Sequence, residues 1–164
     1  MQCYTAPPDF GRCVTVELVQ VGEDMPALLF SAASGGVSGF GVHFALLRPG
    51  MGKDLEELFP SDISISNQSQ HAFWNEHTIS DVSIFVTAED IWGPGEGHFS
   101  EHRYMISAYV LRTADDFDAY YLEDRFMTVR KYDLVDSNDD VLASERQEIL
   151  SRLWRVKSES EWHP

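Results

Sequence analysis

The sequence predicts a single α+β domain, in which a curved and mostly antiparallel sheet carries a C-terminal helix on one face. Segments rich in β-branched and aromatic residues recur up to Leu134, and turn-forming residues separate them. Only the last stretch has the apolar spacing of a long helix. A chain of 164 residues that is 43% hydrophobic can bury a core of its own. We therefore expect one domain over residues 1–157 and a loose tail over 158–164.

The first third of the chain predicts strands joined by a glycine-rich connection. Val14–Val21 is dense in β-branched residues, and Gly22 follows it as a turn residue would. Apolar runs follow at 27–32 and 42–47, and the second of these favours a strand. Between them, residues 33–41 contain too many glycines for a regular helix and predict either a flexible loop or a bulged hairpin.

The middle of the chain predicts less regular structure. Asp54–Phe59 has the pattern of a short helical turn, and Pro60 would end it. Residues 61–75 are rich in Ser, Asn and Gln and predict an irregular connection. Ile79–Ala88 alternates enough to predict a half-buried strand.

His102–Thr113 is the clearest strand in the sequence. Both of its faces are apolar, which favours a central place in a sheet. An acidic turn is expected over 114–117. The following segment predicts a hairpin that turns at Glu123-Asp124 and returns as a strand over 126–134.

A helix is predicted near the C-terminus. Ser144 and Gln147 form a capping-box pattern, and five apolar residues follow at helical spacing, namely Ile149, Leu150, Leu153, Trp154 and Val156. Residues 136–140 begin like a calcium-binding loop, but Val141 replaces the required glycine and Gln147 the bidentate glutamate. A loop that caps the helix is the better interpretation.

The charge of the chain indicates which partners to expect. Twenty-seven acidic and twelve basic residues give a net charge of −15. Such a surface repels phosphates and anionic lipids, so neither nucleic acid nor a membrane is expected as a partner. A basic protein or peptide is favoured instead. The alternative is that the acidity only keeps the protein soluble.

Aromatic residues near acidic, turn-rich segments are candidates for contacting such a partner, because aromatic anchors dominate many protein interfaces. The alternative is that these rings cover the core beneath long loops. The candidates are Phe73, Trp74, Trp92, Phe117, Tyr120 and Tyr121, together with the carboxylates Asp115 and Asp116.

The two cysteines bear on the compartment in which the protein works. Cys3 and Cys13 flank a segment of turn-forming residues that can bring them together, so we expect a disulfide. A disulfide would indicate a periplasmic or secreted protein, whereas two reduced thiols would indicate the cytoplasm.

No sequence motif identifies a reaction, and no cofactor is expected. His98 and His102 are the densest pair of possible metal ligands, but on an extended chain they would lie about 13 Å apart at roughly 3.3 Å per residue. The sequence therefore favours a non-catalytic acidic binding protein of the inhibitor or immunity type. A small metal-dependent or Ser/His hydrolase and a structural or assembly subunit are the alternatives, and the oligomeric state stays open.

Overall fold

The computed structural model describes residues 13–22, 24–36, 39–50, 54–59, 63–66, 69–76, 79, 83–97, 100–114, 117–133 and 140–160. These residues form nine strands and one helix. The first sheet contains β1 (Cys13–Gly22), β2 (Met25–Gly36), β3 (Gly39–Pro49), β4 (Leu55–Glu57) and β5 (Ile63–Ser66). The second contains β6 (Gln70–Asn75), β7 (Ser83–Ile91), β8 (Arg103–Ala114) and β9 (Phe117–Met127). The helix, α1, spans Val141–Ser160.

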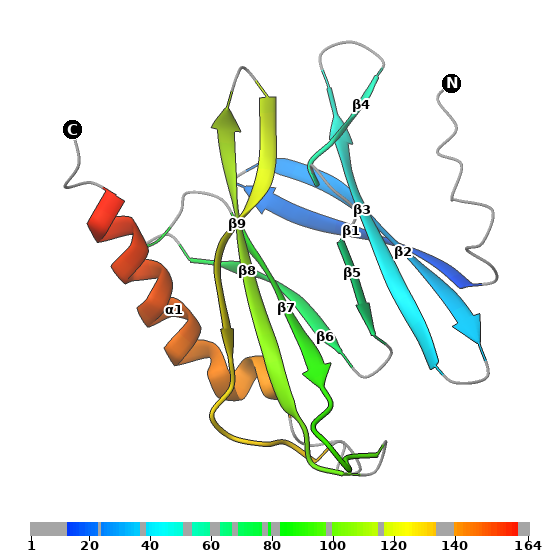
Figure 1. Ribbon diagram of the computed structural model, residues 1–164. Helices are drawn as coiled ribbons and strands as arrows, with labels where there is room; N and C mark the ends of the chain where they lie inside the picture. Colours follow the sequence, from blue (N-terminus) through cyan, green and yellow to red (C-terminus); the bar gives the residue numbers. More distant parts are fainter. Residues whose placement is uncertain are drawn as a thin grey trace.

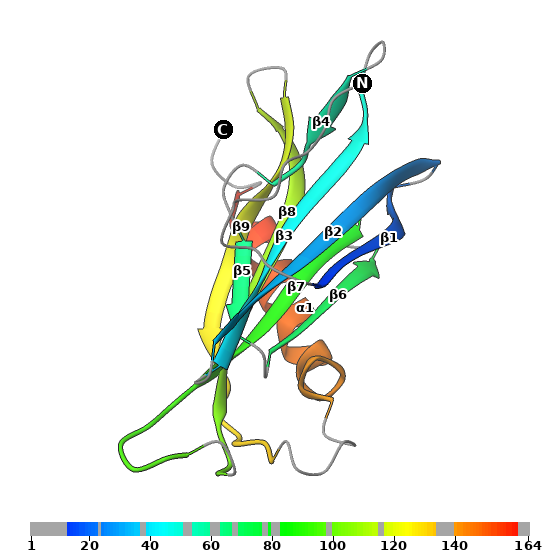
Figure 2. The same ribbon diagram turned by 90° about the vertical axis from the view of Figure 1, so that its right-hand side faces the viewer.

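The elements are arranged in three layers (Figures 1 and 2). The first sheet has the order β1-β2-β3-β4, with β5 also paired to β3, and the second has the order β6-β7-β8-β9. All described strand pairs are antiparallel. The first sheet lies on one face of the second, and α1 lies on the other face. The predicted α+β class with antiparallel strands and a C-terminal helix is confirmed, but the strands form two sheets where we expected one.

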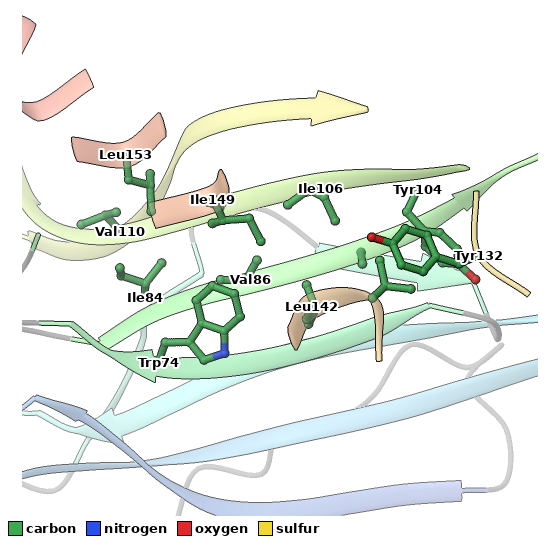
Figure 3. Packing of buried hydrophobic residues seen from close by; sticks show 13 residues of the cluster. Trp74, Ile84, Val86, Tyr104, Ile106, Val110, Tyr132, Leu142, Ile149 and Leu153 are labelled. Atoms are coloured by element: carbon green, nitrogen blue, oxygen red, sulfur yellow. The ribbon is translucent and has the colours of Figure 1, made fainter. Parts of the chain in front are cut away.

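Each face of the second sheet is covered by its own hydrophobic cluster. Between the two sheets, Phe44 and Leu46 of β3 meet Phe85 of β7. Between the second sheet and α1, Ile84 and Val86 meet the helix residues Ile149 and Leu153 (Figure 3). Both clusters consist of large apolar side chains, so removal of their surface from water is the main stabilising contribution.

This double covering changes the expected character of β7. The sequence predicted a half-buried strand, but every residue from Ser83 to Ala88 is buried, because successive side chains face different clusters. The neighbouring strand β8 pairs with both β7 and β9, which confirms the prediction that it is central.

The glycine-rich segment is part of a hairpin. β2 and β3 stay paired from Leu28 and Leu47 to Gly36 and Gly39, without a shift in register. The segment is therefore a hairpin, as one of the two interpretations predicted, but its described residues pair without the expected bulge, and the flexible-loop interpretation is wrong for them.

Two predictions for the middle of the chain are wrong. Residues 55–57 form β4, which pairs with the end of β3 and is no helical turn. The expected irregular connection over 61–75 contains β5 and β6, which pair with β3 and β7. In both cases the segment is a strand because it pairs with a neighbouring strand, β3 or β7, and the local sequence does not reveal that pairing.

The acidic turn predicted over 114–117 is confirmed, because Ala114 at the end of β8 pairs with Phe117 at the start of β9. The second predicted turn, at Glu123-Asp124, is wrong. Tyr109 pairs with Leu122 and Ala108 pairs with Asp124, so Glu123 is one extra residue in β9. The strand continues through this β-bulge and ends at Met127.

The helix begins earlier and ends later than predicted. The carboxylate of Asp140 accepts a hydrogen bond of 3.0 Å from the backbone N–H of Ala143, as an N-cap does. Ser144, the predicted cap, lies within the helix. Loop residue Asp140 therefore caps α1, as the sequence predicted for 136–140. The helix also continues to Ser160, so residues 158–160 are helical instead of part of a tail.

Candidate protein-binding surface

Two hairpin ends, one from each sheet, lie at the same end of the molecule (Figures 1 and 2). The first leads from β3 to β4, and the second joins β8 to β9. The segment after β4 connects them, because Leu58 bonds to both sheets. Its N–H donates to the carbonyl of Leu46 at 2.8 Å, and its carbonyl accepts from the N–H of Tyr120 at 2.7 Å. These backbone bonds fix the distance between the two ends.

Arg48 makes a second connection between the hairpins. Its guanidinium lies 2.8 Å from a carboxylate oxygen of Glu56 in β4 and 2.6 Å from one of Asp118 in β9. The side chain of Arg48 is only 16% exposed, so water screens these ion pairs less than it would at an open surface. One cation thus holds two carboxylates together and leaves a local excess of negative charge.

The ionisation of these groups follows from the same contacts. Burial by itself lowers the pKa of Arg48, but the hydrogen bonds and charges of Glu56 and Asp118 outweigh burial and raise that pKa above its ordinary value. The hydroxyl of Thr113 and the guanidinium of Arg48 both donate to Asp118 and hold the pKa of its carboxyl below the usual range. Asp118 is therefore negatively charged at neutral pH.

Exposed apolar side chains are found on the same two hairpins as these charges. Phe117, the first residue of β9, is 74% exposed, and Tyr121 lies four residues further along the same face at 37%. Successive side chains of a strand alternate, so this face is opposite to the one on which Asp118 and Tyr120 face the first sheet. Leu55 of β4 is 40% exposed and lies between Asp54 and Glu56 in the sequence. We call this set the hairpin-end surface: Asp54, Leu55, Glu56, Glu57, Phe117, Asp118 and Tyr121.

Three of the aromatic residues that the sequence suggested for partner contact lie in the core. The ring of Phe73 is 4.9 Å from that of Phe85, and Tyr120 is 1% exposed and donates to the carbonyl of Ser83. Trp74 faces α1, where the guanidinium of Arg146 lies 4.6 Å from its ring. Successive residues of β6 reach opposite faces, and both faces are covered, so neither Phe73 nor Trp74 can form an exposed anchor.

Trp92 directly follows β7, which ends at the other end of the second sheet from the hairpin of β8 and β9 (Figure 1). It is 41% exposed and stacks on the ring of His102, with centroids 5.0 Å apart. The sequence grouped Trp92 with Phe117 and Tyr121, but the structure separates them. Asp115, Asp116, His98 and Cys3 lie outside the described residues, and the side chain of Cys13, at the start of β1, does as well.

His102 is the second candidate centre that the sequence suggested. Its ring is fully buried, and Nδ1 lies 3.3 Å from a carboxylate oxygen of Glu96. No hydrogen-bond partner for Nε2 is found in the described part of the chain. A histidine oriented by a carboxylate is one half of many hydrolytic sites, but this ring lies beneath Trp92.

Glu96 is the organising group of this second cluster. Hydrogen bonds from Lys131, from the N–H of Gly93 and from His102 lower its pKa to about 2. Among the residues that the structure describes, no three His, Cys, Asp or Glu side chains are grouped so as to hold a metal ion.

No family model, curated protein or solved structure matches this chain. Across the described ranges, no helix combines the length and the apolar character needed to cross a membrane.

Sequence reasoning did not identify Arg48 as part of the site. A signal was available, because Arg48 is one of only three basic residues in the first hundred, and an isolated cation among carboxylates is a candidate for a structural ion pair. Its partners could not be inferred, since Glu56 and Asp118 belong to different sheets.

Proposed function

We propose that the protein is a non-catalytic acidic binding protein that recognises a basic protein or peptide, as an inhibitor or immunity protein does. The hairpin-end surface makes the contact. Carboxylates of β4 and β9 attract the positively charged partner, and Phe117 with Tyr121 provides the apolar contact that slows dissociation.

The observation that carries this proposal is the pair of ion pairs made by Arg48. Two hairpins from different sheets are joined there, and their carboxylates outnumber the cations. Phe117, which precedes Asp118 in β9 and projects from the opposite face, is 74% exposed. An exposed ring on a fixed strand loses little conformational entropy when it binds. The sequence adds Asp115 and Asp116 immediately before Phe117, which increases the local negative charge.

A panel of purified basic proteins, with poly-lysine as a nonspecific reference, tests the proposal. The wild-type protein should bind at least one member of the panel more tightly than poly-lysine, and binding should weaken as salt rises. Phe117→Ala should weaken that specific binding by about tenfold or more but leave retention by poly-lysine unchanged.

Matched variants distinguish binding at the hairpin-end surface from nonspecific attraction by the overall negative charge. The double variant Asp54→Lys and Glu57→Lys should weaken binding strongly, whereas Glu101→Lys, an exposed carboxylate at the other end of the second sheet, should change it little. Binding that ignores salt, or that responds equally to both changes, would refute the proposal.

The two alternative functions have their own tests. A hydrolase built on His102 would be supported by about one equivalent of zinc in protein purified without an affinity tag. An assembly subunit would be supported by a stable oligomer in a measurement of solution mass. Neither the zinc content nor the solution mass should change in Phe117→Ala or in the double variant of Asp54 and Glu57.

The remaining expectations belong to the same proposal. They are a periplasmic or secreted location, with the cytoplasm as the alternative, the organisation of the chain as a single domain, and curvature of the sheet that carries α1. A location outside the cytoplasm suits a protein that neutralises a basic partner, and it depends on the bridge between Cys3 and Cys13.

A further inference from the structure

A pocket of about 320 Å³ lies at the end of the second sheet opposite the hairpin-end surface. It is formed where β7 ends, β8 begins and β9 ends. This volume is at the lower end of the range for small-molecule sites. The described residues that line it are Ile91, Gly93, Glu96, Arg103, Met127 and Lys131.

The strand register explains why these side chains converge. Ile91 pairs with Arg103, so both project from the same face of the sheet. Met127 pairs with Met105, which lies two residues beyond Arg103 on that face. The pocket therefore has an apolar wall made by Ile91 and Met127, with a guanidinium beside it.

The charges in the pocket are not balanced. Both oxygens of Glu96 are already engaged: one accepts from Lys131 at 2.5 Å, and the other accepts from the N–H of Gly93 at 2.6 Å. Lys131 therefore neutralises Glu96. Within the described residues, no hydrogen bond or ion pair engages the guanidinium of Arg103, which leaves the lining with one net positive charge.

A net positive pocket is unexpected in a chain whose net charge is −15. We propose that it binds a small carboxylate with a short apolar chain, whose carboxylate pairs with Arg103 and whose chain lies on Ile91 and Met127. The planar guanidinium matches a carboxylate in shape. A phosphate dianion fits less well, because it would carry twice the charge of the available cation and would lie close to Glu96.

Titration with hexanoate, followed by nuclear magnetic resonance, tests this site. We expect saturable shifts at Ile91, Arg103 and Met127, and none at Phe117 or Asp118. Hexylamine, which has the same chain length and the opposite charge, should not bind there, and inorganic phosphate should bind more weakly than hexanoate.

Variants complete the test. Arg103→Gln should weaken hexanoate binding by about tenfold or more, because it removes the charged partner. Arg155→Gln, which removes an exposed arginine of α1, should leave the affinity unchanged. Arg103 is itself exposed, so the thermal midpoint of Arg103→Gln should match that of the wild type.

Several results would overturn this inference. Absence of saturable shifts would do so, as would equal binding of hexylamine, tighter binding of phosphate, or an unchanged affinity in Arg103→Gln. The inference is independent of the proposed protein partner, because Arg103→Gln should not alter binding at the hairpin-end surface, and Phe117→Ala should not alter binding of hexanoate.

Discussion

The guanidinium of Arg48 lies 2.6 Å from the carboxylate of Asp118, and this ion pair joins a strand of the first sheet to a strand of the second. Replacing Arg48 by methionine should lower the free energy of unfolding by about 1–3 kcal/mol, because Glu56 and Asp118 would then face each other without the cation between them. Urea denaturation would measure the change. Arg155→Met is the matched control, since Arg155 is exposed, and an equal loss in both variants would contradict a specific role for Arg48.

Phe85 should be among the residues most sensitive to truncation. It is fully buried, and its ring lies 5.0 Å from that of Phe59 and 4.9 Å from that of Phe73. Phe85→Ala should reduce the free energy of unfolding by about 3–5 kcal/mol. Phe117→Ala removes the same side chain from an exposed position and should change stability by less than about 0.5 kcal/mol, which also makes it suitable for binding experiments.

Substitutions at the start of α1 can distinguish the observed N-cap from the one that the sequence predicted. Asp140→Ala should destabilise the protein by about 1 kcal/mol, because the N–H of Ala143 loses its acceptor. Ser144→Ala should be neutral or slightly stabilising, since alanine has the higher helix propensity within a helix. The reverse order in thermal or chemical denaturation would show that Ser144 is the cap.

Glu96 should make stability depend on pH in acid. Its folded-state pKa is about 2, below the ordinary value of 4.5, so the folded state binds fewer protons than the unfolded state between these values. The stabilisation is therefore complete above about pH 4.5 and is lost as the pH falls toward 2.

Chemical denaturation across this pH window tests that expectation. Lys131→Met removes the largest cause of the shift and should make the decline in stability shallower. Lys157→Met removes a lysine of α1 and should leave the profile unchanged. The same profile in both variants and the wild type would contradict the assignment to Glu96.

The two cysteines provide a direct test of the expected compartment. Labelling of thiols in unreduced protein should modify neither Cys3 nor Cys13 if they form the predicted disulfide. Full modification without reduction would remove the argument for an oxidising environment and favour the cytoplasm.

The features that the sequence predicted well are those whose signal lies within one segment. β8 was identifiable as central because both of its faces are apolar, and the turn at 114–117 because polar residues separate two strand-like stretches. The bulge at Glu123 could not be predicted in this way. Acidic residues such as Glu123 and Asp124 would end most strands, but here they form ion pairs with Arg112 of β8 and Arg152 of α1. Long-range partners decide such cases, and a local pattern does not contain them.

The candidate site shows the same limit. Phe73 and Phe117 both lie in polar surroundings in the sequence, and only their strand partners distinguish them. Phe73 pairs with Phe85 and faces the other sheet, whereas Phe117 begins a strand at the end of a hairpin. The prediction of exposed aromatic residues near carboxylates could therefore name a set of candidates, but it could not separate the exposed members from the buried ones.

The burial of β7 on both faces has a consequence for how the molecule opens. Separation of α1 would expose Ile84 and Val86 to water, and separation of the first sheet would expose Phe85. Either partial opening would thus uncover large apolar side chains of this strand, at a free-energy cost of several kcal/mol. Its backbone amides should consequently exchange with deuterated solvent only when the whole chain unfolds, whereas the ends of the hairpins should exchange through local fluctuations.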